Sequence, residues 1–155
     1  MLTKKEVETV MSTQDHIDNV RKYLQKIIDE LFNRGAIHDQ SKMQRPELSI
    51  FTEYTPKLAG STYGSDEYKQ FLNEMRVALE HHYANNRHHP EHFKNGVSGM
   101  NLIDIIEMFC DWKAATMRHN DGDMRKSIKI NTKRFGLSQQ LKSILMNTVN
   151  FIEEV

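Results

Sequence analysis

LIDIIEMFCDWKAATMRH, residues 102–119, is the most apolar segment of the chain with helical spacing. Asp104, Glu107 and Asp111 stand at positions i, i+3 and i+7, so a helix places the three carboxylates on one face. That face is either the solvated side of an amphipathic helix or part of a site. For Asp111 we favour the site, because a carboxylate among apolar neighbours is costly to bury without a cation.

Capping and turn residues on both sides of this segment divide the rest of the chain into further helices. No segment indicates a strand, and residues 1–12 are either a short helix or a frayed end. The sequence therefore predicts an all-α fold, a single compact domain of about six helices spanning residues 1–155. The expected helices are 12–33 (beginning at Ser12 or Thr13 and closed by Gly35), a short piece at 36–42, and 46–58, 66–82, 102–119, 123–135 and 138–155.

Composition excludes several classes of protein. Lys and Arg number 21 and Asp and Glu number 21, so no net charge attracts duplex nucleic acid or an acidic membrane. The single cysteine, Cys110, excludes an internal disulfide and Cys-based zinc sites. No apolar run reaches the roughly 20 residues of a membrane span, and the first residues do not resemble a signal peptide. We expect a soluble, cytoplasmic protein.

Histidine is concentrated in one part of the chain. Five of the eight histidines fall in HHYANNRHHPEH, residues 81–92. His82 continues an apolar stripe and is expected to point inward, whereas His88 and His89 precede Pro90, where a helix seldom persists. Each histidine could instead have a surface or hydrogen-bonding role, and for His92 and His119 that interpretation is preferred.

His38 and Asp39 form an adjacent pair of metal-ligand types. Upstream, His16 shares a helical stripe with Val20 and Leu24 and is expected to face the interior. The pair alone is weak evidence, but it gains weight from His16 before it and Asp111 after it.

The order His16, His38-Asp39, Asp111 resembles the H…HD…D signature of the HD superfamily of metal-dependent phosphohydrolases. HIDNVRKYL resembles its first helix, EMFCDWKAA its last-aspartate helix, and HDQSK its HD-x-x-K form, with Lys42 as the phosphate-contacting lysine. A narrower resemblance is to small HD-type proteins of phages and bacteria; it implies a fold and no particular substrate. It rests on HDQSK, KLAGSTYGSDEYK, ALEHHYANNRHHPEHF and INTKRFG, within about residues 13–136.

The resemblance implies a divalent metal cofactor, one or two ions, with Mn, Fe, Co, Zn and Mg not distinguished. His16, His38, Asp39 and Asp111 would hold the first ion. In superfamily members with two ions, extra histidines between the HD pair and the last aspartate hold the second, and here the histidines in that interval are His81, His82, His88 and His89.

The implied activity is hydrolysis of a small phosphate ester, with a nucleotide as the expected substrate. Asp39 would bridge the ions, and Lys42 would stabilise the charge developing on the phosphate. Tyr63 either covers the site from a loop or packs on the domain edge. No spacing ranks the candidate substrate contacts, which are Arg45, Lys57, Tyr63, Lys69, Lys113 and Arg134.

Two alternatives remain open. HD proteins resembling the diiron oxygenases use the same ligand types to activate dioxygen, and the histidine-rich second site permits that chemistry. A non-catalytic protein with a structural metal, or a phage protein that blocks a host partner, would present the same ligands in a single sequence. The sequence does not determine the oligomeric state.

Overall fold

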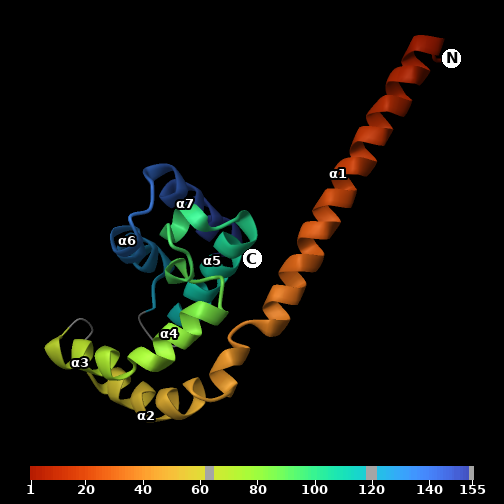
Figure 1. Cartoon of the computed structure of the whole chain (residues 1–155). Helices are drawn as coiled ribbons and strands as arrows, with labels where there is room; N and C mark the ends of the chain where they lie inside the picture. Colours follow the sequence, from red (N-terminus) through yellow and green to blue (C-terminus); the bar gives the residue numbers. More distant parts are fainter. Residues whose placement is uncertain (62–64, 118–121, 154–155) are drawn as a thin grey trace. The chain divides into compact units, whose positions relative to one another are not determined.

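The computed structural model of the chain is all-helical, with no strand among the residues it describes (Figure 1). These are residues 1–61, 65–117 and 122–153, so Tyr63 and His119 lie outside the described part. The chain divides into two compact units, Met1–Ile37 and His38–Val155, and each is described here by itself. The all-α prediction is confirmed, and the prediction of one domain over residues 1–155 stays a prediction.

The first unit is built on one long helix, α1, which runs from Lys4 to Ile37. It begins earlier than the predicted Ser12 or Thr13, and it continues through Gly35. Thr13 does not cap a helix, because its hydroxyl donates to the backbone carbonyl of Thr9 at 2.8 Å, within a continuous helix. The capping interaction lies upstream, where the Glu6 carboxylate accepts from the Thr3 backbone N–H at 2.6 Å and the Glu6 backbone N–H donates to Thr3 Oγ1 at 3.3 Å.

The second unit contains six α-helices and three short 3₁₀ helices in its described residues. Two predicted helices are interrupted. The piece at 36–42 is replaced by the end of α1, a turn at His38-Asp39 and η1, while the helix at 66–82 is broken at Met75. The elements are η1 (Gln40–Met43), α2 (Glu47–Gly60), α3 (Asp66–Glu74), α4 (Arg76–Asn85), η2 (Pro90–His92), η3 (Gly96–Gly99), α5 (Leu102–Thr116), α6 (Met124–Phe135) and α7 (Gln139–Glu153).

The break at Met75 has no signal in the sequence. Met75 has φ −79° and ψ 0°, and its side chain is buried. Neither glycine nor proline marks the position, so helical periodicity continues through it. Local helix propensity therefore does not indicate the break. The Met75 side chain is buried there against neighbours that are distant in sequence.

The main apolar core lies where α5, α6 and α7 pack together (Figure 1). Its position leaves the opposite, acidic side of α5 free to build a polar site. Asn101 starts α5 in a capping box with Asp104, and Gly136 ends α6 in the left-handed region at φ 62°. The buried core residues are Phe109, Met124, Ile128, Leu137, Leu145 and Val149.

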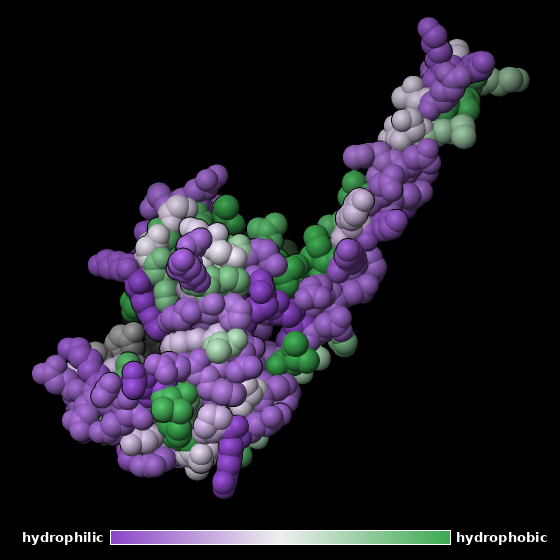
Figure 2. Space-filling view, viewed as in Figure 1, coloured by the Kyte–Doolittle hydropathy of each residue, from purple (hydrophilic) through white to green (hydrophobic). Residues whose placement is uncertain are grey.

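The face of the protein shown in Figure 2 is mainly hydrophilic, with apolar side chains scattered between charged ones. Among the described residues, none of the helices combines the length and apolar character that a membrane crossing requires.

Candidate metal centre

Asp39 occupies an unusual backbone conformation at the point where the chain enters η1. Its φ of 56° and ψ of 14° place it in the left-handed region, and it is the one non-glycine residue with positive φ in the described part of the chain. Aspartate tolerates this conformation better than most residues. The turn separates the end of α1 from η1 and gives Asp39 and His38 backbone directions that a continued helix would not allow.

One group of ligand atoms surrounds Asp39. Oδ1 of Asp39 lies 3.3 Å from Nε2 of His82 and 3.5 Å from Nε2 of His88. His89 completes the group, with its Nε2 2.8 Å from Nε2 of His82. The ligand atoms of these four residues lie within 4.8 Å of one another, so a single ion could contact all of them. We refer to Asp39, His82, His88 and His89 as the Asp39 group.

A second group adjoins the first. It consists of His38, His88 and Asp111, again with ligand atoms within 4.8 Å of one another, and we refer to it as the Asp111 group. Nε2 of His38 lies 3.6 Å from Oδ1 of Asp111 and 3.6 Å from Oδ2 of Asp39. The two oxygens of Asp39 therefore face the two groups, which is the arrangement of a bridging carboxylate.

Glu107 orients two of the ligand histidines. Nδ1 of His38 lies 2.9 Å from Oε1 of Glu107, and Nδ1 of His88 lies 3.1 Å from the same oxygen. A histidine that donates from Nδ1 to a carboxylate keeps a lone pair on Nε2, the atom that faces a metal. Glu107 is 9% exposed, so water competes little for these contacts.

Glu47 orients the histidines of α4 in the way that Glu107 orients His38 and His88. Its Oε2 lies 2.8 Å from Nδ1 of His82, and its Oε1 lies 2.7 Å from Nδ1 of His81. Glu47 is fully buried, and His82 is nearly so. Asn86 and Ser41 extend this network, since Asn86 Nδ2 donates to Ser41 Oγ at 2.8 Å. His82 is therefore fixed in orientation with Nε2 directed at Asp39.

Two buried atoms in the Asp39 group have no hydrogen-bond partner in the described residues. They are Oδ1 of Asp39 and Nε2 of His88. Buried polar atoms are nearly always paired, and a buried carboxylate oxygen without a partner is especially costly. Both atoms are ligand atoms and face each other, so a cation between them would satisfy both.

The electrostatics divide the histidines into two kinds. The carboxylates of Asp111 and Glu107 raise the pKa of His38 to about 10. Burial lowers the pKa of His89 to about 3, and burial also lowers the pKa of His82. A histidine must be neutral to bind a metal, so His82 and His89 are already in the binding form, whereas an ion would displace a proton from His38.

Asp39 and Asp111 are held as carboxylates. Burial acts to raise the pKa of Asp39, but its hydrogen bond and charge interaction with Lys42 outweigh burial and lower it. Burial opposes ionisation of Asp111 as well, and contact with His38 together with the nearby His88 and His89 lowers its pKa. Both groups are therefore ready to bind a cation at neutral pH.

The structure brings together most of the predicted site residues. His38, Asp39, His82, His88, His89 and Asp111 converge, and Nζ of Lys42 donates to Oδ2 of Asp39 at 2.6 Å. His81 lies in neither group and is bound to Glu47 at the edge of the cluster. His16 lies on α1 in the other unit, where its side chain is exposed, and its role as a ligand stays a prediction.

The acidic positions of α5 have two different roles. Asp104, fully buried, accepts from Nε and Nη2 of Arg87 at 3.1 and 3.0 Å and takes part in the α5 capping box. Glu107 and Asp111 belong to the histidine cluster. His92, for which a surface or hydrogen-bonding role was predicted, donates from Nδ1 to the backbone carbonyl of Tyr83 at 2.8 Å.

Sequence reasoning missed Glu47. Its place directly after Pro46 is typical of an ordinary acidic residue in the first turn of a helix. The signal that could have found it is the pair of histidines at 81 and 82, since buried ligand histidines need carboxylate partners. Sequence position alone does not link Glu47 to this pair of histidines, because 34 residues separate Glu47 from His81.

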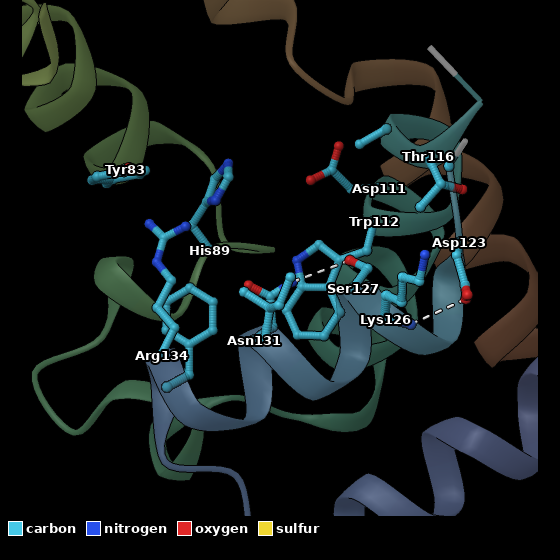
Figure 3. A pocket seen from close by; sticks show the side chains of 14 residues that line it. Tyr83, His89, Asp111, Trp112, Thr116, Asp123, Lys126, Ser127, Asn131 and Arg134 are labelled. Carbon is cyan, nitrogen blue, oxygen red and sulfur yellow. Dashed lines mark hydrogen bonds between the residues drawn. The ribbon is translucent and has the colours of Figure 1, made fainter. Parts of the chain in front are cut away.

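A pocket of about 480 Å³ opens beside the cluster (Figure 3). His89 and Asp111 lie at its edge, and side chains of α4, α5 and α6 form its walls. Of the described substrate candidates, Arg134 alone lines this pocket. Lys57, Lys69 and Lys113 instead pair with Glu53, Asp66 and Glu153, and Arg45 is exposed.

The fold and the cluster define an all-helical protein with buried histidine and aspartate groups that could hold a metal ion. The chain belongs to the family of unknown function DUF5662, whose match covers residues 5–154. No curated protein and no solved structure matches the chain.

Proposed function

We propose that the protein is a metal-dependent phosphohydrolase of the HD type that acts on a small phosphate ester. The observation that carries the proposal is the buried pair Asp39 Oδ1 and His88 Nε2, which lie 3.5 Å apart without hydrogen-bond partners in the described residues. Lys42 of the HD-x-x-K motif contacts Asp39, and His89 and Asp111 of the two groups line the pocket. Residues for a cation, a phosphate contact and space for a ligand therefore lie close together.

The donor set favours a transition metal. The Asp39 group offers three imidazole nitrogens and one carboxylate, and the Asp111 group offers His38, Asp111 and the His88 nitrogen that both groups share. Imidazole suits Zn and Fe, whereas Mg, Ca and Mn prefer oxygen ligands. The carboxylate partners Glu47 and Glu107 add the outer contacts that orient histidine ligands in metal sites. A divalent transition metal therefore fits the residues present.

The geometry supports two ions more than one. Asp39 directs one oxygen to each group, and a single imidazole nitrogen of His88 cannot serve both. His88 therefore belongs to the Asp39 group, toward which its Nε2 is directed. The Asp111 group would then offer His38, Asp111 and Oδ2 of Asp39, and the ligand role that the superfamily resemblance implies for His16 stays a prediction.

Bound divalent ions would supply the chemistry of the reaction by lowering the pKa of water and offsetting phosphate charge. The residues of the chain have separate roles. Glu47 and Glu107 accept from Nδ1 of His82, His38 and His88 and so orient the Nε2 atoms of these rings. Lys42, next to Asp39, would contact a phosphate oxygen and stabilise charge as the ester bond breaks.

The experiment compares phosphate release by the whole protein loaded separately with Zn, Mn, Co and Fe, using a panel of phosphate monoesters. Release should stop when a chelator is added and in Asp39→Asn. Lys42→Met should lower the rate about 100-fold or more while metal content is unchanged, because it removes charge stabilisation and no ligand. Lys129→Met, on the exposed side of α6, is the matched control. Release that persists in Asp39→Asn or after chelation would overturn the proposal.

A second function is favoured by one observation. The same histidine and carboxylate donors suit iron, and a carboxylate shared between two sites is also an arrangement for paired iron ions. An oxygenase would consume dioxygen in the iron-loaded form and release no phosphate from any ester. A non-catalytic metal protein would do neither, and its metal would change only its stability.

A further inference from the structure

The pocket shown in Figure 3 is continuous with the candidate metal centre but is made of other residues. It shares only His89 and Asp111 with the metal-binding groups. Its volume of about 480 Å³ falls within the range of sites for small organic molecules. A ligand in the pocket could therefore place one end at the metals and the rest of its structure against α5 and α6.

One wall of the pocket is flat and apolar. The rings of Trp112 and Phe135 are nearly parallel, with an interplanar angle of 7° and centroids 6.2 Å apart. Ala115 extends this wall, and Ile130 lines the pocket while half exposed. Such a surface suits a flat ring, because aromatic groups stack on each other and gain from removal of apolar area from water.

A polar edge of the pocket comes from one face of α6. Ser127, Asn131 and Arg134 follow one another along this face and point into the pocket (Figure 3). Asn131 Nδ2 donates to Ser127 Oγ at 3.4 Å, which is a long hydrogen bond that a ligand could replace. An amide offers both donors and acceptors, so it can pair with a ring edge that carries both.

Arg134 lies at the end of the pocket that is nearer His89 (Figure 3). It donates to Glu91 Oε1 at 2.8 Å, and its guanidinium lies 4.6 Å from the centre of the Phe135 ring. These contacts fix its position beside the aromatic wall. A cation held there fits a ligand whose negative group lies toward the metals and whose ring lies deeper along α6.

We infer that this pocket holds the organic part of the substrate, and that this part is a flat heteroaromatic ring stacked on Trp112 with its hydrogen-bonding edge at Asn131. The position of the phosphate at the metals rests on the proposed function, whereas binding of the ring in the pocket does not. An aliphatic or sugar phosphate leaves the aromatic wall uncovered. Trp112 and Asn131 are then the residues that determine specificity.

The test uses the fluorescence of Trp112, because it is the single tryptophan of the chain. The whole protein is titrated with adenosine, guanosine, cytidine and thymidine, and with ribose 5-phosphate as the ligand without an aromatic ring. At least one nucleoside should quench Trp112 saturably, more tightly than ribose 5-phosphate. Asn131→Leu should weaken that binding about 10- to 100-fold, the effect of losing a well-formed paired hydrogen bond. Lys133→Ala, an exposed residue elsewhere on α6, should leave it unchanged.

Nucleosides carry no phosphate, so the result is independent of hydrolysis. Saturable quenching by a nucleoside without phosphate release from any ester would leave the ring site standing and overturn the proposed function. Phosphate release without saturable quenching by any nucleoside would overturn the ring site alone. Equal binding of ribose 5-phosphate, or Asn131→Leu with unchanged affinity, would also overturn it.

Discussion

Oδ1 of Asp39 and Nε2 of His88 face each other across 3.5 Å, and neither has a hydrogen-bond partner in the part of the chain that the structure describes. Each atom is buried, and each carries a lone pair when Nδ1 of His88 donates to Glu107. Such a pair is unfavourable without a cation or a proton between its members. A cation between the two atoms would bind imidazole nitrogens. The carboxylates of Glu47 and Glu107, which contact Nδ1 of the surrounding histidines, direct those nitrogens toward it.

Asp39→Asn tests the shared ligand. Asparagine keeps the size of the side chain and tolerates the left-handed backbone at this position, so the turn should remain. We expect the bound divalent metal, measured by elemental analysis after dialysis, to fall to less than half that of the unaltered protein. The matched control is Asp66→Asn, at a fully exposed aspartate of α3. Unchanged metal content in Asp39→Asn, with helical circular dichroism intact, would contradict the assignment.

Glu107→Gln tests orientation of the ligands without removing one. The variant should bind the metal about 10- to 100-fold more weakly, because His38 and His88 lose the carboxylate that fixes their rings. Isothermal titration with Zn²⁺ measures this difference. Glu91→Gln, which changes a carboxylate paired with Arg134, is the comparison and should bind as tightly as the unaltered protein. Equal affinities in Glu107→Gln and the unaltered protein would show that Glu107 does not act on the ligands.

Metal removal should destabilise the protein. A ligand that binds only the folded state at 100 times its dissociation constant adds about 2.7 kcal/mol to the free energy of unfolding. We therefore expect the thermal midpoint to fall when a chelator is added and to return when Zn²⁺ is restored. The same treatment of Asp39→Asn should change its midpoint little. An identical fall in both proteins would mean that the metal stabilises them from another place.

Asn101→Ala tests the local origin of α5. The Asn101 side chain accepts from the Asp104 backbone N–H at 3.0 Å, and the Asp104 side chain accepts in return from the Asn101 backbone N–H. Loss of this cap should lower the free energy of unfolding by about 1 kcal/mol, as measured by urea denaturation. Asn95→Ala, at an N-cap without a side-chain cap bond, should have a smaller effect. An equal loss of unfolding free energy in the two variants would show that the Asn101 cap is not the cause of the destabilisation.

The parts of the fold that follow from local sequence were predictable. Helical periodicity and caps located α2, α5, α6 and α7 within a few residues, since Asn101, Gly136 and Pro46 act close to where they stand. The extension of α1 through Thr13 was not predictable, because a threonine hydroxyl can cap a helix or bond within one.

The site was predictable to the level of its metal-ligand types. His82 was expected to point inward because it continues the stripe of its helix, and the structure confirms that it is buried. His88 and His89 lie in a turn, where no helical periodicity indicates which side chains point inward. Their orientation therefore could not be predicted from the sequence. Glu47 and Glu107 could not be separated from ordinary surface acids, since their histidine partners lie 19 to 69 residues away.

Anomalous diffraction from crystals of the whole protein grown with Zn²⁺, recorded at energies above and below the zinc absorption edge, tests the metal centre most directly. We predict an anomalous peak bounded by Asp39, His82, His88 and His89, with a second peak at His38 and Asp111 if two ions bind. No zinc peak among these side chains, or zinc peaks only at surface positions away from them, would contradict it.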